Sequence, residues 1–148
     1  MPTPGILFMP HGNLGYSQLH PSKRGWVVTE SYAKILDIVL RLGTKIAFEA
    51  SGETLSIIAA ERPDVLKKLQ HGIKEGLIEP VGSPRVHIML ANIDPEIGLH
   101  ALIDGLDTWE KFTGTRPVTG WNPECGWAWF IPDIFRAAGF EILIADAD

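Results

Sequence analysis

The stretch Asp94–Trp121, DPEIGLHALIDGLDTWEKFTGTRPVTGW, contains a whole helix followed by a strand and decides the fold class. Asp94 and Pro95 predict where the helix begins, because aspartate caps the first turn and proline suits the first helical position. Apolar residues then recur at helical spacing: Leu99, Leu102, Ile103, Leu106 and Trp109. Gly114 predicts the end of the helix, since glycine readily takes the left-handed conformation found there. The apolar run Val118–Trp121 then predicts a β-strand.

The same order of helix, glycine and strand recurs along the chain. Further helices are predicted over Thr29–Leu42, Pro63–Glu75 and Pro132–Ala138, with caps at Gly43, Gly76 and Gly139. Further strands are predicted over Gly5–Pro10, Lys45–Ala50, Leu77–Gly82 and Glu141–Ala145. Strands that alternate with helices are typical of β/α units and a parallel sheet. The sequence therefore predicts an α/β fold.

Length and composition are those of one globular domain. The chain has 148 residues, of which 45% are hydrophobic and 21% charged, which suits a packed core. The net charge of −5 argues against a nucleic-acid partner, whose phosphates favour basic proteins. The single cysteine excludes an internal disulfide, and no apolar run reaches the roughly 18 residues of a membrane span. We therefore expect a soluble, cytoplasmic protein.

Titratable side chains occur where the predicted strands end. His11 follows the first strand, His87 the third and Glu124 the fourth, while Glu49 lies just inside the second. In successive parallel β/α units, all strand carboxyl ends lie at one edge of the sheet, where such folds build their sites. We expect a binding or catalytic site at this edge.

Residues 121–127, WNPECGW, place the carboxylate of Glu124 between Trp121 and Trp127. One interpretation is a nucleophile that attacks the anomeric carbon of a sugar, with the indole rings stacked on the pyranose. The other is a surface glutamate beside tryptophans that only fill the core. His11 and His87 each have two interpretations as well. Each either binds a substrate hydroxyl or is a loop histidine that hydrogen-bonds to nearby backbone.

Residue spacing argues against a metal or a cofactor. The chain has no His-x-x-x-His, no Cys-x-x-Cys and no glycine-rich phosphate loop. Cys125 has no base paired with it in the sequence, so we interpret it as a packing residue. We expect neither a bound metal nor a cofactor.

The segment 121–127 resembles the Trp-x-Pro-Glu motif of glycoside hydrolase family 57, which includes α-amylases, 4-α-glucanotransferases and glycogen-branching enzymes. Residues 11–13, His-Gly-Asn, resemble the family's first motif, usually His-Gln-Pro. A second family motif, which supplies substrate contacts, is similar to the segment that contains Glu79, Gly82 and His87. The resemblance implies parallel β/α units that form part of an incomplete (β/α)₇ barrel, with Glu124 as the catalytic nucleophile.

The implied activity is that of a retaining hydrolase or transglycosylase acting on α-glucans or maltooligosaccharides. His11, Trp121, Trp127 and His87 would line its sugar subsites. A retaining enzyme needs a second carboxyl about 5–5.5 Å from the nucleophile, and in this family that aspartate belongs to a later motif. We therefore expect residues 1–148 to be one partial catalytic domain, the N-terminal part of a barrel, inactive by itself. Two alternatives stay open: a metal-dependent polysaccharide deacetylase or mannosidase-like hydrolase, and a non-catalytic glucan-binding domain.

Overall fold

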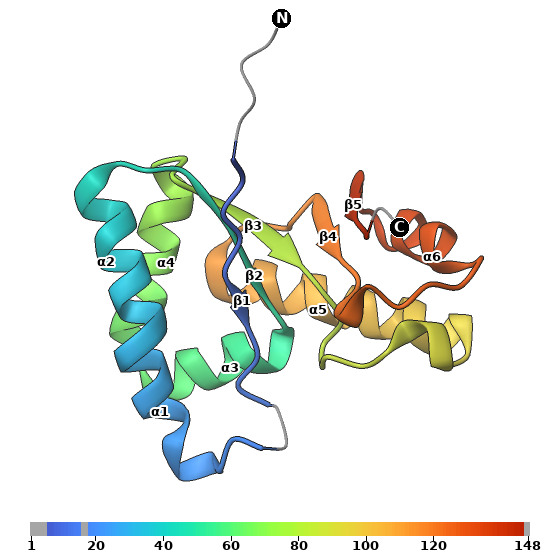
Figure 1. Cartoon of the computed structure of the whole chain (residues 1–148), viewed down its shortest axis with the longest axis horizontal. Helices are drawn as coiled ribbons and strands as arrows, with labels where there is room; N and C mark the ends of the chain where they lie inside the picture. Colours follow the sequence, from blue (N-terminus) through green and yellow to red (C-terminus); the bar gives the residue numbers. More distant parts are fainter. Residues whose placement is uncertain (1–5, 16–17, 147–148) are drawn as a thin grey trace, which may run out of the picture.

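The protein is built on one parallel β-sheet with helices packed along one face and at both ends (Figure 1). The computed structural model describes residues 6–15 and 18–146. The strands are β1 (His11–Gly12), β2 (Ile46–Ala50), β3 (Ile78–Gly82), β4 (Thr119–Trp121) and β5 (Ile142–Ile144). They pair in the order β1-β2-β3-β4-β5 and every neighbouring pair is parallel. Parallel strands in sequential order are the arrangement of a β/α barrel, so the predicted α/β fold is confirmed.

Helices connect each strand to the next. They are α1 (Arg24–Val27), α2 (Ala33–Leu42), α3 (Gly52–Glu61), α4 (Pro63–Lys74), α5 (Pro95–Thr113) and α6 (Ile131–Ala138). Short turns occur at η1 (Pro21–Lys23), η2 (Val28–Tyr32), η3 (Leu90–Asn92) and η4 (Pro123–Cys125). Helix α2 packs beside α4, while α5 runs behind the sheet and contacts both α3 and α6 (Figure 1). None of the described helices is both long enough and apolar enough to cross a membrane.

The predicted helix ends agree with the structure. The Asp94 side chain accepts a hydrogen bond from the backbone N–H of Glu96, which caps the start of α5. All four predicted glycine caps have a positive φ: Gly43, Gly76, Gly114 and Gly139. Local chain chemistry thus sets where these helices stop.

The first strand is shorter than predicted and lies later. Gly5 is outside the described residues, and β1 comprises only His11 and Gly12. The preceding chain still runs along β2, because the carbonyls of Phe8 and Pro10 accept hydrogen bonds from Ala47 and Glu49. Pro10 has no N–H to donate, so the ladder is incomplete until His11.

Two helical segments also differ from the prediction. Helix α3 was not predicted, although Ser51 caps it by accepting a hydrogen bond from the Thr54 N–H at 3.2 Å. The predicted helix Thr29–Leu42 divides into the π-helical turn η2 and α2. Leu36 and Val39 of α2 are buried, whereas Leu42 is 64% exposed because it is the last residue of that helix.

Two hydrophobic clusters hold the helices to the sheet. The larger joins β2 to α2, α3 and α4, and the other packs α5 against α6. Trp109 of α5 is fully buried in the larger cluster, and its indole N–H donates to the carbonyl of Ala50 at 3.0 Å. This contact places α5 directly behind the carboxyl end of β2.

Candidate functional site

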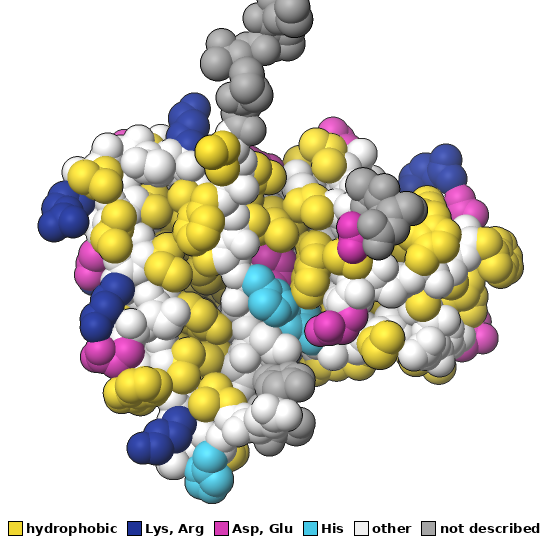
Figure 2. All heavy atoms as spheres, in the orientation of Figure 1, with side chains coloured by type: hydrophobic (Ala, Val, Ile, Leu, Met, Phe, Trp, Pro, Cys, Tyr) yellow, Lys and Arg dark blue, Asp and Glu magenta, His cyan; other side chains and the backbone are white. Residues whose placement is uncertain are grey.

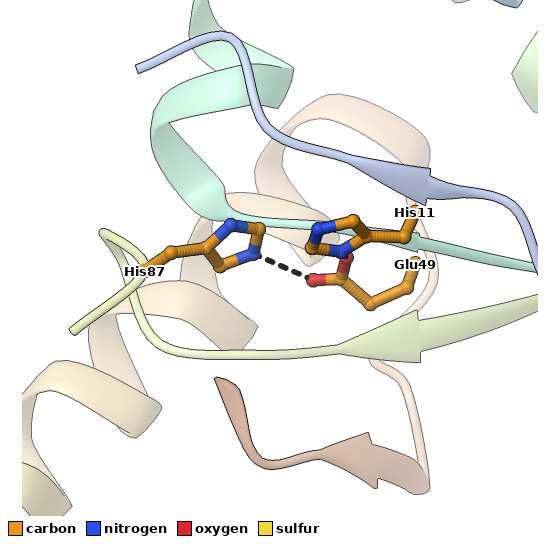
Figure 3. Close-up of side chains that lie close together, drawn as sticks. All are labelled: His11, Glu49 and His87. Carbon is orange, nitrogen blue, oxygen red and sulfur yellow. Dashed lines mark hydrogen bonds and ion pairs between the residues drawn. The ribbon is translucent and has the colours of Figure 1, made fainter. Parts of the chain in front are cut away.

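Three side chains from three strand ends meet at one edge of the sheet (Figure 3). His11 comes from β1, Glu49 from β2 and His87 from the loop after β3. His11 Nδ1 lies 2.7 Å from Glu49 Oε2, and His87 Nε2 lies 2.9 Å from Glu49 Oε1. The Ser83 hydroxyl donates to the same Oε1 atom at 2.5 Å. We call His11, Glu49, His87 and Ser83 the imidazole–carboxylate cluster.

Sheet register explains why His11 and Glu49 meet. They are paired residues of the parallel ladder between β1 and β2, so their side chains point to the same face of the sheet. Their neighbours in β2, Phe48 and Ala50, point to the opposite face and into the core beneath the helices. Glu49 itself is 0% exposed. The strand therefore buries a carboxylate in front of the sheet.

Hydrogen bonding decides the charge state of the cluster. Burial alone would raise the pKa of Glu49, but hydrogen bonds from His11 and His87, the charge of His87 and the Ser83 bond outweigh it and lower that pKa. The hydrogen bond to Glu49 raises the pKa of His11 against an opposing effect of burial, and the charges of Glu49 and Glu124 raise it further. The buried carboxylate is thus held in its ionised form.

An aromatic group surrounds the two imidazoles. The His11 and His87 rings stack with centroids 5.0 Å apart and 15° between their planes. The half-buried Trp121 of β4 meets both rings edge-on, at 4.6 and 5.6 Å. Histidine side chains consequently appear in the middle of one molecular face, bordered by hydrophobic and acidic side chains (Figure 2). His11, His87 and Trp121, three of the predicted site residues, are brought together.

Glu124 lies in the η4 turn that follows β4. Its φ of 58° and that of Cys125, 49°, are both left-handed, which is uncommon for two consecutive residues other than glycine. The Asn122 side chain holds the turn by donating to the carbonyl of Gly126. The carboxylate is exposed and has no hydrogen bond or ion pair within residues 6–15 and 18–146. Backbone strain at an unpartnered carboxylate is typical of functional positions.

Two further predicted residues lie outside the aromatic group. Trp127 is 63% exposed and has no ring contact with any described residue. Glu79 is exposed in β3, where its Oε1 accepts a 3.4 Å hydrogen bond from Thr119. The structure therefore shows one aromatic wall, Trp121, packed against the imidazoles.

Glu49 is the residue that sequence reasoning passed over. The sequence places Glu49 inside the second strand but indicates no role for it, since a buried strand position usually holds an apolar side chain. The glutamate within the otherwise apolar run IAFEA is the sequence feature that could have indicated a role for this residue. Its two imidazole partners are each 38 residues away, so no local spacing could connect them.

The cluster offers three potential metal ligands within 4.8 Å of one another: His11, Glu49 and His87. Zinc would hold each nitrogen at about 2.0–2.1 Å, which separates tetrahedral ligand atoms by about 3.3 Å. The observed separations of 2.7 and 2.9 Å are hydrogen-bond lengths, and each carboxylate oxygen serves a different ring. The geometry is that of a hydrogen-bonded cluster, and a cation would have to open it.

A large cavity lies away from the imidazole–carboxylate cluster. A cavity of about 760 Å³ opens at the amino ends of the strands, between Lys45, Gln70, Lys74 and Thr115. It contains none of the cluster residues. We place the candidate site at the carboxyl ends because the convergent polar and aromatic side chains are there.

Comparison with known proteins identifies a family for this chain. The family model of glycosyl hydrolase family 57 matches residues 12–148. The fold is similar to that of the 4-α-glucanotransferase from Thermococcus litoralis, with 26% identity, a TM-score of 0.84, and coverage of 95% of this chain and 22% of that chain. No curated protein matches the sequence.

Two more distant structures share the fold. The peptidoglycan deacetylase PdaC from Bacillus subtilis has 19% identity and a TM-score of 0.61, covering 80% of this chain and 54% of that chain. The α-amylase AmyC from Thermotoga maritima has 14% identity and a TM-score of 0.75, covering 95% and 39%. The chain thus spans less than two thirds of each structure. Because the family model matches nearly the whole sequence, the protein belongs to glycosyl hydrolase family 57.

Proposed function

We propose that this chain forms the nucleophile-bearing part of a retaining α-glucan hydrolase or transglycosylase. The observation that carries the proposal is Glu124, an exposed carboxylate without a partner among the described residues. It lies in a strained turn at the functional edge of a family 57 domain. Its charge contributes to raising the pKa of His11, which supports a place for the carboxylate near the aromatic group of His11, His87 and Trp121.

The chemistry proceeds in two displacements. A Glu124 oxygen bonds to the anomeric carbon while the glycosidic C–O bond breaks, and the leaving oxygen takes a proton from a general acid. Water or a sugar hydroxyl then attacks the same carbon, gives its proton to that group, now a base, and releases Glu124. Both hydrolysis and transfer follow from one intermediate, so the acceptor decides between them.

The second carboxyl group cannot be Glu49. Its side chain is 0% exposed and both oxygens already accept hydrogen bonds, so it has no free atom to offer a leaving group. We propose that the acid/base carboxyl comes from a part of the enzyme beyond these 148 residues. By itself the chain would then bind sugar without turning it over.

Substrate contacts follow from the surfaces that remain free. The His11 side chain is 42% exposed, and Glu49 occupies only its Nδ1, so Nε2 can bind a sugar hydroxyl. Trp121 presents an aromatic surface beside it, and the exposed Trp127 supplies a second stacking surface in this proposal. The His87 side chain is 7% exposed, and its ring stacks on the ring of His11.

One observation supports a second candidate. The two imidazoles and the carboxylate are the ligand types of a hydrolytic zinc site, which suits a metal-dependent deacetylase or mannosidase-like hydrolase. Stoichiometric zinc in the purified protein, with activity lost on chelation, would favour that candidate. A glucan-binding domain without catalysis would instead bind maltooligosaccharides in a complete protein that never turns them over.

The decisive experiment is Glu124→Gln in the complete protein. We expect turnover of maltooligosaccharides to fall on the order of 10⁴-fold or more, because the amide cannot form the glycosyl–enzyme bond. A 2-deoxy-2-fluoro glucosyl probe should label the peptide that contains Glu124 in the wild type and leave the variant unlabelled. Glu61→Gln, the same change at the exposed end of α3, is the control. Activity close to wild type in Glu124→Gln would overturn the assignment.

A further inference from the structure

The buried carboxylate of Glu49 is the feature that the proposed reaction does not use. It is fully buried, yet three donors converge on it: the rings of His11 and His87 and the hydroxyl of Ser83. A buried charge is costly unless it is paired and hydrogen-bonded. A buried charge beside the candidate site has either a role in that site or a role in the stability of the fold. These two roles predict different results when Glu49 is substituted.

We propose that Glu49 is a positioning residue, which fixes His11 with its proton on Nδ1 so that Nε2 faces the sugar subsite beside Trp121. This rests on the proposed function only in naming the ligand as a sugar.

The first step of the argument concerns protons. An ionised carboxylate only accepts hydrogen bonds, so every nitrogen that faces it must carry a proton. His11 therefore holds a proton on Nδ1 and His87 holds one on Nε2. When His11 is neutral, the lone pair is on Nε2, where it can accept from a sugar hydroxyl; when His11 is protonated, the same atom donates. Glu49 thus decides which atom of the ring meets the ligand.

The second step concerns orientation. The two ring nitrogens point in nearly opposite directions, so binding Nδ1 to a buried atom turns Nε2 outward. His11 makes no other hydrogen bond to a described residue, and its side chain is 42% exposed. Stacking on His87 and edge contact with Trp121 hold the plane of the ring, and the hydrogen bond to Glu49 selects its orientation within that plane. A polar group held in place before the ligand arrives loses little conformational freedom on binding.

The third step separates this role from a metal site. A metal would require Nδ1 of His11 and Nε2 of His87 to be unprotonated, because the lone pair must face the ion. The two 2.7–2.9 Å contacts instead require protons on both atoms. The protonation state of His11 Nδ1 therefore distinguishes the positioning role of Glu49 from a metal site.

The test begins with the wild-type protein. Long-range ¹H–¹⁵N correlation spectra should show neutral His11 as the Nδ1–H tautomer, whereas a free imidazole favours Nε2–H. The Nε2–H tautomer, or a zinc equivalent bound to the purified protein, would overturn the proposal without any variant. The same spectrum of Glu124→Gln should keep the Nδ1–H tautomer, so the failure of the proposed nucleophile would leave this result standing.

Glu49→Gln then tests the consequence, with Glu61→Gln as the matched control. We expect kcat/KM on maltooligosaccharides to fall by about 10–100-fold, by analogy with carboxylates that orient metal-binding histidines, whose removal costs about that much activity. The titration midpoint of His11 should move to lower pH, and any limb of the pH–rate profile that reports His11 should move with it. If Glu49 has a purely structural role, Glu49→Gln lowers the melting temperature but leaves the titration midpoint of His11 and the pH–rate profile of the folded protein unchanged. That result would refute the proposal. If Glu49→Gln does not fold, the wild-type tautomer decides alone.

Discussion

Helix α5 approaches the candidate site so closely that one methyl group should disturb it. An ideal Cβ built on Gly105 would lie 2.1 Å from the carbonyl oxygen of Ser83 and 3.1 Å from the carbonyl carbon of Pro84. The obstacle is backbone, which cannot turn away as a side-chain end can. Ser83 is also held from the other side by its hydrogen bond to Glu49. Gly105→Ala must therefore push the β3 end and α5 apart.

The magnitude follows from two opposing effects. Alanine favours the helix over glycine by about 1 kcal/mol. Against this, a methyl group forced into a packed site costs typically about 1–3 kcal/mol, and separation also stretches the 2.8 Å hydrogen bond from the Arg85 N–H to the carbonyl of Ala101, worth about 1 kcal/mol. We expect the free energy of unfolding to fall by about 1–3 kcal/mol. At roughly 2–4 °C per kcal/mol, the melting temperature falls by about 2–12 °C.

Gly98→Ala on the same helix is the matched control. Its Cβ would meet only side-chain ends, Ile134 Cδ1 at 3.1 Å and Leu90 Cδ2 at 3.3 Å, which can move. Denaturant unfolding and thermal melting of both variants measure the difference, and we expect Gly98→Ala within about 1 kcal/mol of the wild type. Equal stability of the two variants would refute the argument that α5 touches the β3 backbone directly.

Two further predictions concern the core and the pH dependence. Trp109→Phe removes buried volume and leaves the Ala50 carbonyl without its indole donor, so urea unfolding should show a loss of about 2–4 kcal/mol; a loss below about 1 kcal/mol would contradict this packing. The pKa of His11 is raised above its ordinary 6.5, and that of Glu49 is lowered below its ordinary 4.5. The hydrogen bond between these two side chains therefore stabilises the fold fully between pH 4.5 and pH 6.5. Its contribution is lost as pH rises through the folded-state pKa of His11 or falls through that of Glu49. The stability difference between wild type and Glu49→Gln should therefore be largest near pH 4.5–6.5, and a difference independent of pH would contradict the contact.

Helices and strands were predictable where local chemistry is repeated. Helix α5 begins at the Asp94 cap and ends at Gly114, as its own residues require. Prediction was less accurate where tertiary contacts intervene: Pro10 interrupts the ladder to β2, so β1 begins only at His11, and η2 divides the helix predicted over Thr29–Leu42. These differences arise from strand pairing and helix packing, which the spacing of apolar residues along the sequence does not predict.

The sequence by itself determined the α/β class and the family, and it singled out Glu124 as the candidate nucleophile. Residues 121–127 do this because the motif, the turn and the carboxylate are contiguous in the chain. Only the tertiary structure decided that Glu49 joins His11 to His87. That contact needs β1 paired with β2 in one register, and the loop after β3 folded back over the same edge. Burial then turned an isolated strand glutamate into a charge that needs three donors, because water could no longer solvate it.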